Sequence, residues 1–299
     1  MAVNSGNDND NDNELSFHIV DVFAQTKYAG NQLAVVRDAD TLTDNEMLTI
    51  AREFDYSETT FIEGGSQQGY DVRIFTPEEE VPFAGHPTLG TAKILMDEYA
   101  DDSNGNGVRL NLPVGSIPVE DDDGVLWMEQ EEPEFGATFD GSRVADVLGI
   151  SADEIDEKCP IQAVSTGLPA VIVPLQTLDA VKRCEINRAE YEAFIDGNGA
   201  KIIFVFASET YDANDLNARM FAPYYGVPED PATGSSNGCL AGYLVKHSYF
   251  NEEEIEVTVE QGYEIDRPSL LYLRAKKNGN EIEVSVGGEV VRVADGELV

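Results

Sequence analysis

The sequence predicts an α+β fold with two pseudo-symmetric domains, each a curved, barrel-like β-sheet around a central helix. The prediction rests first on a strand-and-loop plan that occurs twice. Arg73-Ile-Phe-Thr-Pro77 precedes a Gly-rich helix start that includes Gly90, and Arg219-Met-Phe-Ala-Pro223 precedes another that includes Gly238. The two arginines are 146 positions apart and the two glycines 148. It rests second on the many short strands that surround only two buried helices.

Length and composition suit two domains. The chain has 299 residues, 42% of them hydrophobic, which is enough for two cores of ordinary size. We expect a first domain over residues 14–130, completed by a C-terminal strand near residues 288–299, and a second domain over residues 131–287. Residues 1–13 are rich in Asn and Asp and can bury little, so we expect a disordered acidic tail there.

Periodicity separates strands from helices in the first half. The β-branched and aromatic stretch from Leu15 to Phe23 and the short run from Leu33 to Val36 are typical of strands. Thr43 and Glu46 form a capping box, and apolar residues with helical spacing follow as far as Phe54. An amphipathic helix is therefore expected after Thr43.

The helix that opens at Gly85 differs from this one because it has few polar residues. Lys93 is its only charged residue before Met96, so we expect it to be buried on nearly all sides. In the second half, the Gly238 helix takes the equivalent place. Further strands are expected at 108–112, 125–128, 170–173, 201–207, 255–259 and 282–286, and helices at 143–148 and within 180–195.

Charge excludes two classes of partner. The chain has 57 acidic and 19 basic residues, a formal net charge of −38, and the acids are spread along its length. Nucleic acids and anionic membrane surfaces would repel such a protein. Dense negative charge is tolerated in molar salt, where the Debye length falls to about 3 Å. We therefore predict a halophilic protein.

Three widely spaced cysteines, Cys159, Cys184 and Cys239, favour neither a disulfide framework nor a zinc site. The N-terminal region has no apolar segment typical of a signal peptide, and no apolar run approaches the ~18 residues of a membrane helix. A cytoplasmic location is expected.

Both Gly-rich helix starts are candidate anion sites. The first N–H groups of a helix have no intrahelical partner and lie at the positive end of the helix dipole. Small residues in Gly85-His86 and in Thr233-Gly-Ser-Ser236 would let a carboxylate approach these groups closely. Alternatively, the glycines only permit tight turns before buried helices.

Three titratable residues are candidates for the site. His86 lies in the first helix start, where a structural and a catalytic role are equally compatible with its position. Glu58 lies between a helix and a strand, beside the apolar Tyr56 and Phe61. Asp230 lies just before the second loop, where neighbouring prolines restrict the backbone.

Several ordered motifs together resemble the PhzF family of phenazine-biosynthesis-like proteins. They are Asp21-Val-Phe-Ala, Gly30-Asn31, Ser57-Glu-Thr-Thr-Phe61, Val81-Pro-Phe-Ala-Gly-His-Pro87 and Glu229-Asp-Pro-Ala-Thr-Gly-Ser235. The resemblance implies a diaminopimelate epimerase-like fold with the site between the two domains. It also implies a homodimer that needs no metal and no organic cofactor.

The resemblance assigns roles to individual residues. It makes Glu58 the catalytic acid/base and His86 and Asp230 its catalytic partners. It places a substrate-binding set nearby, which comprises Asn31, Gly85, Thr233, Gly234 and Ser235. The chain departs from the family at Gln32, where proline is common, so the identity of the ligand stays open. A two-cysteine racemase is disfavoured, because His86 occupies one loop and Cys239 lies inside the second helix.

Together these observations predict a cofactor-independent isomerase that moves a proton on a small carboxylate-bearing metabolite. The alternatives are a small-carboxylate binding protein, or a PhzF-like enzyme with a different reaction. A purely structural module is disfavoured because Glu58, His86 and Asp230 are all present.

Overall fold

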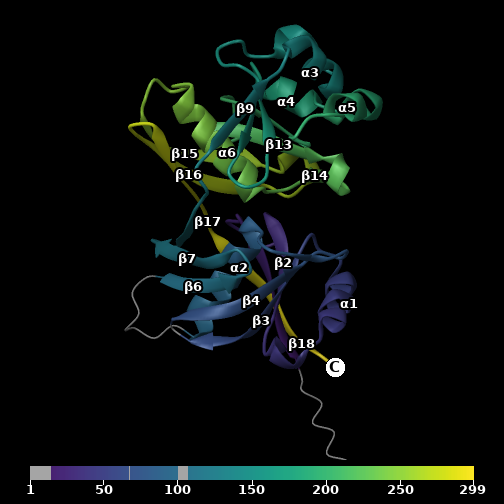
Figure 1. Cartoon of the computed structure of the whole chain (residues 1–299), viewed down its shortest axis with the longest axis vertical. Helices are drawn as coiled ribbons and strands as arrows, with labels where there is room; N and C mark the ends of the chain where they lie inside the picture. The colour runs from purple at the N-terminus through teal and green to yellow at the C-terminus, as the bar shows by residue number, and fades with distance from the viewer. Residues whose placement is uncertain (1–14, 67, 100–106) are drawn as a thin grey trace, which may run out of the picture.

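The computed structural model describes residues 15–66, 68–99 and 107–299. The tail expected at residues 1–13 lies outside these ranges. Figure 1 shows two lobes, with α1 and α2 in one and α3 to α6 in the other. The predicted fold class is confirmed: each lobe is a curved sheet that encloses one long helix.

The helices are α1 (Asp44–Phe54), α2 (Gly85–Tyr99), α3 (Gly141–Leu148), α4 (Leu178–Arg183), α5 (Arg188–Ile195) and α6 (Gly234–Lys246). The strands of the first half are β1 (Leu15–Val22), β2 (Asn31–Val36), β3 (Thr59–Ser66), β4 (Gly69–Phe75), β5 (Glu80–Val81), β6 (Gly107–Leu112), β7 (Gly115–Asp122) and β8 (Val125–Glu129). Those that follow are β9 (Glu134–Thr138), β10 (Gln162–Ser165), β11 (Ala170–Pro174), β12 (Ile202–Ala207), β13 (Leu216–Ala222), β14 (Val227–Asp230), β15 (Glu254–Gln261), β16 (Ser269–Asn278), β17 (Glu281–Gly288) and β18 (Val290–Leu298).

The two halves have the same strand pairing. In the first, β1–β2 is antiparallel, β2–β3 parallel, β3–β4 antiparallel and β4–β6 parallel. In the second, the same order recurs as β10–β11, β11–β12, β12–β13 and β13–β15. The enclosed helix precedes β6 in one half and β15 in the other. The repeat seen in the sequence therefore corresponds to two halves with the same strand topology.

The halves exchange one strand each. β8 and β17 pair antiparallel and join the two parts of the sheet. The strand after β8 pairs with β10, whereas the strand after β17, which is β18, returns to pair with β1. Figure 1 shows β18 in the lobe that contains α1 and α2. The domain limits near residue 130 stay a prediction.

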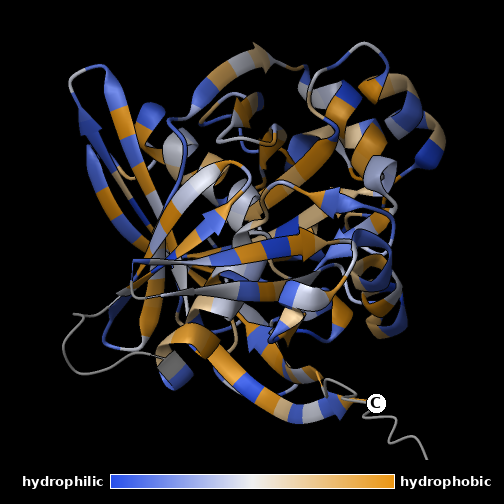
Figure 2. Ribbon diagram, turned by 60° about the horizontal axis from the view of Figure 1, so that its bottom comes forward, coloured by the Kyte–Doolittle hydropathy of each residue, from blue (hydrophilic) through white to orange (hydrophobic). Residues whose placement is uncertain are grey.

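Both central helices are buried, as their few charges predict. His86 to Leu95 of α2 are buried except for the half-buried Lys93, and α6 is buried from Ser236 to Val245. Glycine permits the closeness of α2 to the sheet, since a Cβ on Gly90 would lie 2.5 Å from Leu33 Cδ2. Figure 2 shows hydrophobic residues alternating with hydrophilic ones along many of the surrounding strands.

Local signals explain the outer helices. Thr43 and Glu46 form the expected capping box of α1. The helical region expected within 180–195 consists of two helices, because Asn187 caps the start of α5. Arg219 Nη1 donates to Cys184 O at 2.9 Å and so satisfies a carbonyl at the end of α4. Within the described ranges, no helix is long and apolar enough to cross a membrane.

Candidate active site

The two Gly-rich helix starts meet where the lobes touch. A Cβ added to Gly85 would lie 3.8 Å from Gly234 Cα and 3.9 Å from Ser235 N. The backbones can approach this closely because neither helix carries a side chain at its first residue. The two Gly-rich motifs therefore lie side by side and form a single site at the boundary between the halves.

Backbone donors converge at this place. The first intrahelical bonds run from Thr88 N to Ala84 O in α2 and from Asn237 N to Thr233 O in α6. Before these bonds, Gly85 and His86 in α2 and Gly234, Ser235 and Ser236 in α6 have N–H groups at the positive helix ends, whereas Pro87 has none. The Thr233 side chain does not cap α6. This geometry suits a carboxylate or another small anion.

Glu58 and His86 face each other beside these helix starts. Glu58 precedes β3 and its side chain is 20% exposed, whereas His86 belongs to α2 and its side chain is 8% exposed. Glu58 Oε2 and His86 Nε2 are 3.6 Å apart, and neither atom has a hydrogen-bond partner among the described residues. Two polar atoms left unpaired in a buried site are available to a ligand.

Burial favours the neutral form of both groups. It raises the pKa of Glu58 to about 8, and the negative charge of Asp230 acts in the same direction. It lowers the pKa of His86 to about 3, against the effect of a contact with the Gln32 backbone. Near neutral pH, Glu58 is mostly protonated and His86 is neutral.

Asp230 is a buried carboxylate with donors on both oxygens. Asn31 Nδ2 donates to Oδ1 at 3.1 Å, and the Thr233 hydroxyl donates to Oδ2. Burial raises the pKa of Asp230 to about 6, while these two donors lower it. At pH 7 the site therefore holds an ionised Asp230 close to a protonated Glu58.

The structure brings the sequence-predicted residues together. Glu58, His86 and Asp230 converge at the meeting point of the helices, and the remaining predicted residues either contact Asp230 or form the helix starts, namely Asn31, Gly85, Thr233, Gly234 and Ser235. Their catalytic and binding roles stay predictions.

Sequence reasoning missed two buried amides, Gln261 and Asn237. Asn237 Nδ2 donates to Gln261 Oε1 at 2.9 Å, and Gln261 bonds with both Asp230 and Thr233. The sequence does contain a signal for Gln261. Alternate residues of β15 point into the core, and Gln261 takes the inward position after Val259, where an apolar residue is usual.

A cavity of about 370 Å³ lies elsewhere, on the other side of β13 and β14. Cys184, Arg219 and Glu229 line it, and none of Glu58, His86 and Asp230 does. Arg219 and Glu229 in its wall form a bidentate ion pair. Within the described ranges, no cluster of three or more His, Cys, Asp or Glu residues could hold a metal ion.

The family model for phenazine biosynthesis-like proteins (PhzC-PhzF) matches residues 20–296. The chain belongs to this family. It is 35% identical to an uncharacterised isomerase of Clostridium acetobutylicum, over 96% of this chain and 98% of that protein. It is also 35% identical to the trans-2,3-dihydro-3-hydroxyanthranilate isomerase of Pseudomonas fluorescens, over 95% and 99% of the two chains.

A crystal structure of a PhzF-family protein of Bacillus anthracis supports the fold. It superposes with a TM-score of 0.87 at 27% identity and covers 96% of this chain and 99% of its own. Family membership, predicted from the motifs, and the fold class, predicted from the repeat and the short strands, are thus confirmed.

Proposed function

We propose that this PhzF-family isomerase moves a proton on a small carboxylate without a cofactor, with Glu58 as the acid/base. One observation supports the proposal above the others. Glu58 Oε2 and His86 Nε2 lie 3.6 Å apart where the two helix N-termini meet, and neither atom has a hydrogen-bond partner among the described residues. A substrate bound beside these groups would have Glu58 within reach as a proton acceptor and Nε2 of His86 as a hydrogen-bonding partner.

In the reaction, ionised Glu58 takes a proton from a C–H bond of the substrate. The electron pair of that bond passes into the adjacent unsaturated system and forms a new double bond. Glu58 then returns the proton to a different carbon, so that substrate and product have the same atoms. With its raised pKa, Glu58 is a stronger base than an ordinary carboxylate.

Neutral His86 and the helix ends assist this transfer. Because the contact with the Gln32 backbone holds the hydrogen on Nδ1, neutral His86 presents the lone pair of Nε2, which can accept a hydrogen bond from protonated Glu58 or from a hydroxyl of the substrate. The N–H groups at the starts of α2 and α6 would hold the carboxylate of the substrate. We propose trans-2,3-dihydro-3-hydroxyanthranilate and related unsaturated carboxylates as first candidates, because a relative carries that isomerase name. As in the family, we also propose a homodimer.

The decisive test is hydrogen exchange in D₂O, followed by NMR of the substrate carbons. The parent enzyme should incorporate deuterium at the carbon that is reprotonated, and Glu58→Gln should slow this by about 10²–10⁴-fold. Glu63→Gln is the matched control, because Glu63 lies on β3 and contacts Arg73 outside the site. Equal rates of deuterium exchange in the two variants would show that Glu58 is not the acid/base.

The alternative of a binding protein has its own outcome. Isothermal titration with the same carboxylates would then show binding, while no deuterium enters the substrate. Glu58→Gln would change the affinity alone.

A further inference from the structure

We infer that Gln261 is a positioning residue, which turns the Thr233 hydroxyl onto Asp230 and thereby keeps Asp230 in its carboxylate form. The inference rests on the proposed function, since Asp230 belongs to the proposed site. It adds a residue that neither the motifs nor the names of the relatives indicate.

Gln261 is wholly buried at the end of β15 and makes four hydrogen bonds. Its Oε1 accepts from Thr233 N at 3.3 Å and from Asn237 Nδ2 at 2.9 Å. Its Nε2 donates to Asp230 O at 2.9 Å and to Thr233 Oγ1 at 3.2 Å. One side chain thus spans both ends of the segment 230–233.

Backbone partners fix the orientation of the Gln261 amide. The N–H of Thr233 can only donate and the carbonyl of Asp230 can only accept, so Gln261 has one possible amide orientation. The Thr233 hydroxyl receives a hydrogen from Gln261, and its own single hydrogen is directed to Asp230 Oδ2.

The other oxygen of Asp230 is held in the same way. Asn31 Nδ2 donates to the Ala232 carbonyl at 3.0 Å, which fixes the Asn31 amide, and to Asp230 Oδ1 at 3.1 Å. Both carboxylate oxygens therefore face donors, namely the Asn31 amide nitrogen, which can only donate, and the Thr233 hydroxyl, whose hydrogen is directed to Oδ2. A proton on Oδ1 would break the bond from Asn31 and a proton on Oδ2 would reverse the bond with Thr233, whereas the carboxylate accepts both.

This network influences the proposed base. The charge of Asp230 raises the pKa of Glu58, so neutralising Asp230 would weaken Glu58 as a base. The other charged group that acts on Asp230 is Glu229, whose charge raises the pKa of Asp230 and is paired with Arg219. His86 on α2, which lies beside Glu58, is neutral.

The test is a ¹³C NMR titration of aspartate carboxyl groups in the free protein, with Asp230 assigned by its loss in Asp230→Asn. Thr233→Val removes the hydroxyl and should raise the pKa of Asp230 by about one unit. Gln261→Met leaves the hydroxyl free to rotate and should raise the pKa in the same direction. The double variant should shift it no further than Thr233→Val alone.

Gln176→Met is the matched control, because Gln176 donates to the carbonyls of Asp153 and Ile155 far from the site. It should leave the pKa of Asp230 unchanged, and Thr233→Ser should restore the parent value. A parent-like titration in folded Gln261→Met, beside a raised pKa in Thr233→Val, would overturn the inference.

A measurement on the parent protein covers the case in which Gln261→Met does not fold. The Gln261 side-chain ¹⁵N shift should titrate together with Asp230, and a shift that is flat across that range would overturn the inference. Neither titration requires turnover. Failure of the isomerase proposal appears separately, as the absence of deuterium exchange with every substrate tested.

Discussion

At the scale of single residues, the surroundings of two carboxyl groups in the site give them different pKa values. Asp230 receives hydrogen bonds on both oxygens, and its pKa rises only to about 6 despite burial. Glu58 has an oxygen without a hydrogen-bond partner in the described part of the chain and lies near the charge of Asp230, and its pKa rises to about 8. Because the two values differ, one carboxylate is ionised while the other still holds a proton at neutral pH.

This difference predicts the pH dependence of the reaction. A base must be ionised before it can accept a proton, so kcat/KM should increase with pH up to a limb at about 8, the pKa of Glu58 in the free enzyme. Asp230→Asn removes the repelling charge and should move the limb to lower pH. The measurement is kcat/KM from pH 5 to 10, in buffers of constant ionic strength. A limb near the ordinary glutamate value would contradict the assignment.

At the scale of elements, equivalent arginines stabilise the two halves in the same way. Arg73 on β4 forms a bidentate ion pair with Glu80 on β5, at 2.8 and 2.6 Å. Arg219 on β13 forms one with Glu229 on β14, at 2.8 and 2.7 Å. Each pair fixes the short strand that leads toward a Gly-rich helix start. The repeated arginines of the sequence thus support both loops of the site from outside.

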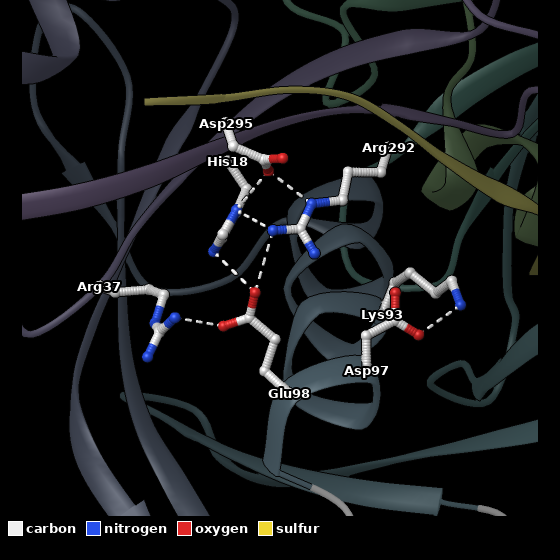
Figure 3. Close-up of polar contacts among 7 residues, drawn as sticks. All are labelled: His18, Arg37, Lys93, Asp97, Glu98, Arg292 and Asp295. Atoms are coloured by element: carbon white, nitrogen blue, oxygen red, sulfur yellow. Dashed lines mark hydrogen bonds and ion pairs between the residues drawn. The ribbon is translucent and has the colours of Figure 1, made fainter. Parts of the chain in front are cut away.

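The far end of α2 is anchored by a charged cluster (Figure 3). Glu98 Oε1 lies 3.0 Å from Arg292 Nη2 of β18 and 3.3 Å from His18 Nε2 of β1, and its other oxygen pairs with Arg37. His18 Nδ1 is in turn 2.8 Å from Asp295. The cluster connects the central helix of the first lobe to the first and last strands of the chain.

We predict that Glu98→Gln lowers the free energy of unfolding by about 1–3 kcal/mol, because Arg37 and Arg292 lose the half-buried carboxylate that pairs with them. The control is Asp97→Asn on the same helix, which removes the i,i+4 pair with Lys93 and should cost only about 0.2–0.5 kcal/mol. Urea unfolding measures both values. Equal losses would mean that the cluster does not anchor β18.

At the scale of the whole molecule, charge dominates. With 57 acidic and 19 basic residues, most carboxylates have no cation available to them. Self-repulsion of this size destabilises a compact chain at low ionic strength, where the Debye length is about 10 Å at 0.1 M salt. We therefore keep the proposal of a halophilic protein.

We predict that the melting temperature increases with KCl between 0.1 and 2 M, by about 2–4 °C for each kcal/mol of repulsion that is screened. Four exposed glutamates provide the control variant when all are changed to Gln, namely Glu131, Glu132, Glu252 and Glu253. This variant should melt higher than the parent in dilute buffer and gain less from KCl. A parent protein equally stable at both salt concentrations would contradict the proposal.

The sequence by itself determined much of the fold, because the relevant signals are local. The capping box at Thr43, the alternation in β15 and the single charge in α2 before Met96 each follow from residues close together in the chain. The repeat of Arg73 at Arg219 indicated the duplication, and the motifs indicated the family and the positions of Glu58, His86 and Asp230.

Only the tertiary structure decided what these residues contact. The exchange of β18 into the first lobe and the approach of Gly85 to Gly234 join segments that are far apart in the chain. The same holds for Gln261. The local sequence indicates only the end of a strand, and the hydrogen bonds from Gln261 to Asp230 and Thr233 form only when the chain folds. Hydrogen bonds and burial depend on neighbours in space, so the pKa of Glu58 could not follow from periodicity.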